Sequence, residues 1–378
     1  MEPLAPHEKV FVDSEIAEDE NHGELSCEEC HGGNPNEPDW RIAHKGVVKD
    51  PSYPDPSETC GACHGGIAEH YQKSLHVSLT PFKRMIDKRA NTAKEVRAKV
   101  NEGRKLHCSS CHSSCGQCHI SRPESVGGGL LEAHLFQRRP PMQLVCTACH
   151  GSRIEKEYFG KNKGIKPDIH KEKYFKCNKC HNADEMHGDG KDYANRYEVE
   201  NAPKCLHCHE SIYEPKSKNA KGHWIHKDLV SCHVCHSQPY KNCYSCHVGR
   251  DEHGYTFYKT KESQIKFKIG LNPLRSKKRS EKFVTLRHVP VDHDSFKFYV
   301  KDGLTNFDTL PTWKLATPHN IRRQTPQNKT CNDCHGNKEI FLLEKDVETN
   351  YLKANKDVIV PPDLLPKTRR DDWGIRAH

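Results

Sequence analysis

The pattern C-x-x-C-H occurs ten times in this chain of 378 residues and uses all twenty cysteines, which leaves none for disulfides. A fold for this chain must therefore accommodate ten similar units, about one for every 38 residues. The motif cysteines are Cys27, Cys30, Cys60, Cys63, Cys108, Cys111, Cys115, Cys118, Cys146, Cys149, Cys177, Cys180, Cys205, Cys208, Cys232, Cys235, Cys243, Cys246, Cys331 and Cys334. The motif histidines are His31, His64, His112, His119, His150, His181, His209, His236, His247 and His335.

The histidine after each second cysteine separates the alternative explanations of this pattern. Zinc ribbons use paired C-x-x-C units but give no reason for that histidine, and neither do disulfide frameworks or thioredoxin-like motifs. Two cysteines three positions apart on a helical turn can each form a thioether to one vinyl group of a porphyrin. The next residue then points its imidazole at the iron. The sequence therefore predicts ten covalent haems of the c type, with the motif histidines as proximal ligands.

The composition fits an interior that side chains do not fill. Only 34% of the residues are hydrophobic and 29% are charged, so little apolar area is buried to offset the entropy lost on folding. Ten flat, apolar macrocycles would supply the missing interior. We expect mostly irregular loops and short α-helices wrapped round a stack of haems, with a minor β-hairpin in the C-terminal third.

The formal charge of +8 does not indicate nucleic-acid binding once the haems are counted. A six-coordinate ferric haem carries about −1 when both propionates are ionised, so ten of them bring the total to about −2. Many lysines and arginines are then expected to pair with propionates or to lie on the solvated surface. We expect no nucleic-acid partner. The sequence has no run of about 18 apolar residues, so we also expect no transmembrane segment.

Eighteen histidines lie outside the proximal set, more than the ten needed to complete bis-histidine ligation. His207 and His233 lie inside C-x-x-C loops, where they are badly placed to reach the far face of their own iron. We expect the second ligands to be His22, His44, His76, His134, His170, His187, His226, His253, His288 and His319. Less favoured candidates are His70, His107, His223 and His293. Bis-histidine ligation gives lower potentials than histidine–methionine ligation, so we expect low-potential haems.

The motifs are unevenly distributed along the chain. Two lie in an N-terminal segment, 1–107, seven in a dense core, 108–247, and one in a C-terminal segment, 248–378, which ends in an extended tail. One helix is predicted near Pro81–Glu102, stopping at Gly103, from the helical spacing of Ile86, Ala90, Ala93, Val96 and Val100. Alternation in "IKFKIG" and "FVTLRHV" predicts a β-hairpin with a basic tip. The short gaps between His112 and Cys115, and between His236 and Cys243, predict two closely stacked pairs of haems.

These motifs resemble those of multihaem c-type cytochromes over nearly the whole chain. The stretches "GGIAEHYQKSLH", "CHSSCGQCHISRP" and "SCHVCHSQPYKNCYSCH" are similar to those of octahaem oxidoreductases and of multihaem electron-transfer relatives. The number of motifs is like that of periplasmic and outer-surface decahaem conduits. The resemblance implies stacked haem pairs, with His76 as a sixth ligand. Catalytic relatives use C-x-x-C-K, a longer cysteine spacing or a cross-linked tyrosine, whereas all ten motifs here are C-x-x-C-H.

The sequence thus predicts an electron-transfer protein, a multihaem cytochrome of the periplasm or the cell exterior, because thioether attachment of haem takes place after export. Its expected partners are redox proteins or extracellular acceptors, and self-association into an oligomer or a filament is a variant of the same function. The alternative is an enzyme, a multihaem reductase of nitrogen or sulfur oxyanions with one open haem site.

Overall fold

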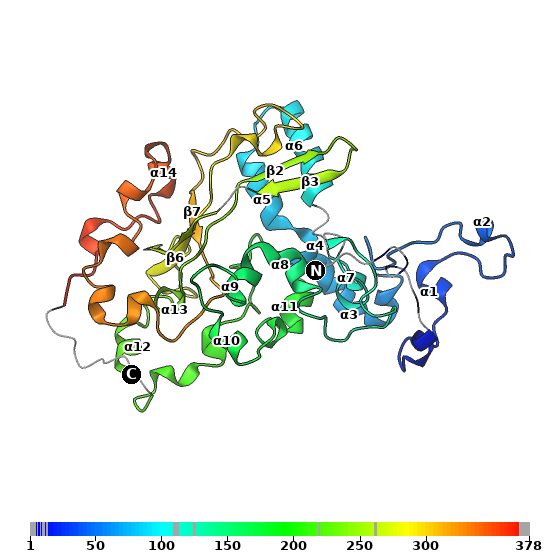
Figure 1. Ribbon diagram of the computed structural model, residues 1–378, viewed down its shortest axis with the longest axis horizontal. Coiled ribbons are helices and arrows are strands. Elements are labelled where there is room, and N and C mark those ends of the chain that lie inside the picture. Colours follow the sequence, from blue (N-terminus) through cyan, green and yellow to red (C-terminus); the bar gives the residue numbers. More distant parts are fainter. Residues whose placement is uncertain are drawn as a thin grey trace. The chain divides into compact units, whose positions relative to one another are not determined.

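The computed structural model (Figure 1) describes residues 5, 7, 9, 12, 14–108, 113–123, 126–217, 220–260 and 263–369. The chain forms two compact units. Unit 1 comprises Met1–Met85, Cys108–Gly151 and Lys176–Ala202, and unit 2 comprises Ile86–His107, Ser152–Phe175 and Pro203–His378. Each of the first two predicted segments thus contributes to both units. No helix among the described residues combines the length and the hydrophobicity needed to cross a membrane.

In eight of the nine motifs that the structure describes, the first cysteine is the first residue of a helix or a 3-10 turn. These turns are the helices α1 (Cys27–His31), α3 (Cys60–Lys73), α7 (Cys115–His119), α8 (Cys146–His150) and α13 (Cys232–His236), and the 3-10 turns at Cys177–Lys179, Cys205–His207 and Cys331–Asp333. Polar residues start several of them: the Ser114 hydroxyl accepts the Gln117 N–H, as expected of an N-cap. The third motif lies largely outside the described residues.

Short helices and irregular segments connect these turns, which confirms the predicted fold class. The remaining short helices are α2 (Trp40–Ala43), α4 (Leu75–Ser78), α9 (Lys156–Tyr158), α10 (Ile169–Glu172), α11 (Ala183–His187), α12 (Ala220–His226) and α14 (Leu352–Asn355).

The prediction of a single helix near Pro81–Glu102 is wrong, because the structure has two helices there. They are α5 (Thr80–Arg89) and α6 (Lys94–Cys108). Between them Asn91 donates its N–H to the Gly303 carbonyl and accepts the Ala93 N–H on its side chain, which starts a new helix. Gly103 does not stop α6. A β-carbon there would lie 2.8 Å from the Tyr299 ring, so the glycine permits close packing inside the helix.

The predicted hairpin is confirmed, as the antiparallel strands β5 (Lys268–Leu271) and β6 (Phe283–His288) of unit 2. A third strand, β7 (Trp313–Leu315), pairs with the other edge of β6, as Figure 1 shows. Two further strand pairs were not foreseen: β1 (Tyr240–Lys241) with β4 (Ile265–Lys266), and β2 (Cys246–Arg250) with β3 (Thr256–Thr260).

An apolar core lies on this sheet. Its buried members include Val284, Leu286 and Trp313, and the C-terminal segment adds Leu342 and Val358. The tail predicted to be extended passes over the sheet, since Leu271 donates its N–H to the Val358 carbonyl. Unit 2 therefore has a conventional side-chain core in addition to its motif turns.

A buried ion pair joins β6 to α9. The Arg287 and Glu157 side chains are 3% and 0% exposed, and Arg287 Nη2 lies 2.5 Å from Glu157 Oε1. The other carboxylate oxygen accepts the His319 N–H at 2.9 Å, and Arg287 Nε donates to the Lys241 carbonyl at 2.7 Å. The two charges are thus hydrogen-bonded as well as paired.

Candidate functional site

Seven motif histidines face a second histidine across a gap. The distances between their ring centroids fall between 5.9 and 6.5 Å. In unit 1 the pairs are His64 with His22, His31 with His134, His150 with His76, and His119 with His187. In unit 2 they are His209 with His170, His236 with His223, and His335 with His226.

This spacing fits one metal ion held between two imidazoles. Bonds of about 2 Å from a metal to each Nε2 atom place the two ring centroids roughly 6 Å apart. The gap is too wide for direct stacking, and at all seven sites the ring opposite the motif histidine is another histidine. Each pair supplies two ligands, whereas a structural zinc site needs four. Among the described residues, no group of three or more His, Cys, Asp or Glu side chains is arranged to hold a metal ion.

Hydrogen bonds at Nδ1 fix the orientation of several of these rings. His31 and His119 place Nδ1 2.7 Å from the carbonyls of Val48 and Gln137. His226 bonds to the Gly222 carbonyl in the same way, at 2.8 Å. An Nδ1–H that donates to a carbonyl leaves the lone pair on Nε2, and this is how metal-bound histidines are usually oriented.

The second histidines differ in their electrostatic surroundings. Burial lowers the pKa of His76, His134 and His187, which favours the neutral, ligating form of each ring. The Asp168 carboxylate, 2.9 Å from Nδ1 of His170, instead raises the pKa of that histidine. A carboxylate at Nδ1 increases the basicity of a metal-bound imidazole.

Six of the ten expected second ligands face a motif histidine: His22, His76, His134, His170, His187 and His226. The seventh partner is His223, which the sequence ranked lower. His223 and His226 lie three residues apart on α12, so both point to one side of the helix. There they meet the histidines of two different motifs, His236 and His335. The sequence signal that could have ranked His223 higher is its i, i+3 spacing from His226.

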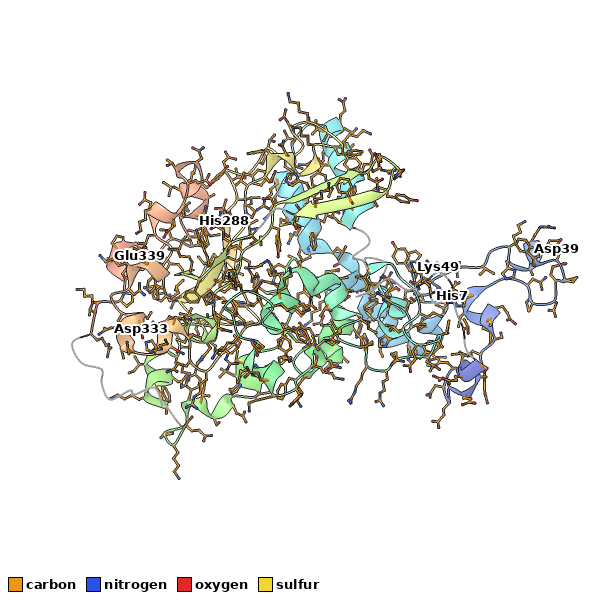
Figure 2. All side chains as sticks on the ribbon, in the orientation of Figure 1. His7, Asp39, Lys49, His288, Asp333 and Glu339 are labelled. Carbon is orange, nitrogen blue, oxygen red and sulfur yellow. The ribbon has the colours of Figure 1, made fainter. Side chains whose placement is uncertain are left out.

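The four other expected ligands have different contacts, and their role stays a prediction. His44 and His319 hold Nδ1 against the carbonyls of Trp40 and Thr317. The exposed ring of His253 lies beside Glu252. His288, labelled in Figure 2 at the end of β6, packs its ring against Trp313 at 5.0 Å.

Thiols of different motifs meet at three places. Cys60 is hydrogen-bonded to Cys115, Cys146 to Cys177, and Cys232 to Cys205. These bonds lower the pKa of Cys60 to about 6, and of Cys146 and Cys232 to about 7. No disulfide is present among the nineteen described cysteines. The second and fourth, fifth and sixth, and seventh and eighth motifs are therefore direct neighbours.

Electrostatic coupling between thiols links these pairs into longer runs. Burial, and then the neighbouring Cys60, raise the pKa of Cys30. The pKa of Cys118 is likewise raised by burial and then by Cys146 of the next motif. The pKa of Cys235 is raised by burial and then by Cys334 of the tenth motif. Unit 1 thus holds a run of motifs one, two, four, five and six, and unit 2 a run of seven, eight and ten. Of the two stacked pairs predicted, one involves the third motif, most of which lies outside the described residues. The other pair, between the eighth and ninth motifs, stays a prediction. The thiol contact of the eighth motif is with the seventh motif.

The ninth motif differs from the other described motifs. Its second cysteine and its histidine start strand β2 instead of a helical turn. The His247 Nε2 atom lies 2.9 Å from Asp292 Oδ2, so it faces a carboxylate. Arg153 donates to Cys243 Sγ at 3.3 Å.

Two more cations lie near Cys243. They are the buried Arg89 and the side chain of Lys314. Burial, together with the charges of Arg89 and Lys88, lowers the pKa of Lys314 to about 8. Three cations therefore lie near Cys243, and one carboxylate, that of Asp292, faces His247.

Comparison of the chain with protein-family models, curated proteins and solved structures found no match. The interpretation of the paired histidines therefore rests on the residues of this chain alone.

Proposed function

We propose that this chain is an electron-transfer protein that carries ten covalent c-type haems, most of them with two histidine ligands. The haem iron supplies reversible one-electron exchange when bound. The observation that carries the proposal is the set of seven histidine pairs, each joining a C-x-x-C-H histidine to a second imidazole at about the same distance.

The residues of the chain have three roles in this function. The cysteines attach the cofactor, and the histidine pairs hold each iron on both faces. Residues such as Asp168 and the Val48 carbonyl turn the rings and adjust their basicity. The runs of neighbouring motifs support close spacing of the redox sites, which single electrons need in order to pass between them.

The compartment and the partners belong to the same proposal. Attachment through thioethers takes place after export, so we place the protein in the periplasm or outside the cell, acting on redox proteins or extracellular acceptors. Self-association into an oligomer or a filament is supported by exposed apolar side chains in unit 1. Trp40, Ile42, Val47 and Val48 are exposed around α2, beside His44.

The angles between the paired rings provide the test. His119 and His187 lie at 30° to each other, whereas His150 and His76 are perpendicular at 90°. Near-parallel imidazoles donate into the same iron orbital and split the d levels strongly, while perpendicular ones split them weakly. We therefore expect His187→Ala to remove a rhombic low-spin signal from the electron paramagnetic resonance spectrum, and His76→Ala to remove one with a large maximum g value.

Each of these substitutions should also add one high-spin signal, because one axial ligand is lost. The matched control is His207→Ala, an exposed histidine inside a C-x-x-C loop that is not among the expected ligands, and it should leave the spectrum unchanged. If all three variants gave the wild-type spectrum, the proposed ligand pairs would be wrong.

A second candidate function is favoured by the ninth motif. His247 faces Asp292, and Arg89, Arg153 and Lys314 make the surroundings of Cys243 positive. Such a site suits an open haem that reduces a nitrogen or sulfur oxyanion. A high-spin signal in the wild-type spectrum that disappears in Cys243→Ala/Cys246→Ala, together with turnover of nitrite, hydroxylamine or tetrathionate, would favour this reductase.

A further inference from the structure

Helix α12 and the tip of the β5–β6 hairpin form one exposed surface of unit 2, which we call the α12 face. It consists of residues 220–231 and 272–282. Trp224 is 54% exposed, and Ile225, Leu229 and Leu274 of the same two segments are exposed as well. Backbone bonds join the two segments, from Phe283 N–H to the Leu229 carbonyl at 2.8 Å and from Ser231 N–H to the Phe283 carbonyl at 3.0 Å.

The exposed tryptophan is held in a fixed position. Its Nε1–H donates to the Tyr213 carbonyl at 2.6 Å, and the rings of Trp224 and Tyr213 are 6.0 Å apart. The Lys227 ammonium lies about 5 Å from both ring centroids, in the range of cation–π contacts. A large aromatic side chain that is already ordered loses little entropy on binding, and tryptophan is enriched at the centres of protein interfaces.

The α12 face is strongly basic. Its two segments contain seven lysines and arginines and only two carboxylates: the basic residues are Lys221, Lys227, Arg275, Lys277, Lys278, Arg279 and Lys282, and the acidic ones are Asp228 and Glu281. Asp228 also accepts the Ser280 hydroxyl at 2.9 Å. A fixed aromatic centre within a cationic rim is complementary to a protein surface that carries carboxylates.

The other side of α12 carries the two histidines that meet motif histidines. His223 and His226 flank Trp224 in sequence and face His236 and His335. The exposed surface is therefore separated from two of the proposed redox sites by a single helix. These are the eighth and tenth motifs, and the tenth ends the run seen in unit 2.

We propose that the α12 face is the docking site for an acidic protein that exchanges single electrons with the haems of the eighth and tenth motifs. This inference rests on the proposed electron-transfer function and adds the place and the chemistry of the partner. A phosphate polymer or an anionic membrane would also be attracted by the positive charge. The acidic protein is favoured because the exposed Trp224 and Ile225 lie on the same helix as His223 and His226, which face two of the proposed redox sites.

The test uses reduced flavodoxin, an acidic one-electron donor, mixed with the haem-loaded protein in a stopped-flow instrument. Lys277→Glu/Lys278→Glu should lower the second-order rate constant at low salt about tenfold, because charge attraction accelerates association. The matched control is Lys94→Glu/Arg97→Glu. It makes the same change in charge on exposed positions of α6 and should react like the wild type. The difference between the two variants should vanish at high salt.

A second variant tests the aromatic centre. Trp224→Ala should slow the same reaction at high salt as well as at low salt, since it removes contact area and not charge. Equal rates for the two charge variants would overturn the docking site. The docking site would also be overturned if Lys277→Glu/Lys278→Glu lost binding to anionic vesicles or duplex DNA but reacted with flavodoxin like the wild type. Haem content and the low-spin spectrum are measured on the same samples, so failure of the proposed function, which is absence of haem, is distinguished from failure of the docking site.

Discussion

Replacing Cys232 and Cys235 by alanine should lower the intact mass of the protein by one haem, about 616 Da, and interrupt the run of motifs in unit 2. The eighth motif is the middle member of that run. Cys232 is hydrogen-bonded to Cys205 of the seventh motif, and Cys235 lies near Cys334 of the tenth. Without this motif, electrons would have to cross the full distance between its two neighbours, and tunnelling falls steeply with distance.

The local fold should survive this change. Val234, inside the motif, is buried with Ile269 and Phe341 beneath the sheet, and neither substitution touches it. The Gln327 side chain donates to the carbonyls of Val234 and Ser237 at 2.9 and 2.8 Å, and those bonds also remain. The loss of electron transfer would then reflect the missing cofactor and not an unfolded unit.

The control is Cys27→Ala/Cys30→Ala, which removes one haem from the end of the run in unit 1. Both variants should lose the same mass. The current carried by a monolayer of the protein between electrodes should fall far more in the Cys232→Ala/Cys235→Ala variant than in the control. Equal currents in the two variants would contradict the idea that the thiol contacts trace the electron path.

Replacing Arg287 by methionine should destabilise unit 2 by about 3–5 kcal/mol, the usual cost of removing one partner of a buried ion pair. The Glu157 carboxylate would keep its bond from the His319 N–H but lose the guanidinium that neutralises it. The measurement is urea unfolding followed by circular dichroism. Methionine keeps most of the side-chain volume, so the effect should come from the charge that is left behind.

The stability of the Arg287→Met variant should also depend on pH in a defined direction. Burial raises the pKa of Glu157, and Arg287 opposes that effect, so removal of Arg287 should raise it further. A folded chain with a raised carboxyl pKa binds a proton more tightly than the unfolded chain does. Its stability then falls as the pH rises from about 4.3, the ordinary value for glutamate, through the folded pKa.

The double variant Glu157→Gln/Arg287→Met is the control for both effects. It leaves no buried charge and should recover most of the lost stability and remove the added pH dependence. If Arg287→Met were as stable as the wild type at neutral pH, the pair would contribute nothing to the fold. A loss of stability that did not change with pH would point to packing instead of charge.

The sequence predicted much of this fold because its strongest signals are local. A C-x-x-C-H segment specifies its own turn, and alternation around residues 272–282 specified the β5–β6 hairpin. The helix near residues 81–102 failed because Asn91 and Ala90 bond to a segment about 200 residues away, at Gly303 and Leu304. A partner at that sequence distance leaves no trace in the periodicity of the helix itself.

The candidate site shows the same division between local and distant information. Motif histidines are fixed by spacing, whereas most of the second histidines come from distant segments. His134 lies 103 positions from His31, and His226 lies 109 positions from His335. Residue type alone could only rank such candidates, and it ranked His223 too low.

The mass of the intact, denatured protein is the most direct test of the central claim, which is that all ten motifs hold covalent haem. The polypeptide of these 378 residues has a mass of 43.3 kDa. The account predicts a mass greater by about 6.2 kDa, because ten attached haems add about 616 Da each and resist denaturation. A denatured mass equal to that of the bare polypeptide, with or without zinc bound in the native state, would contradict it.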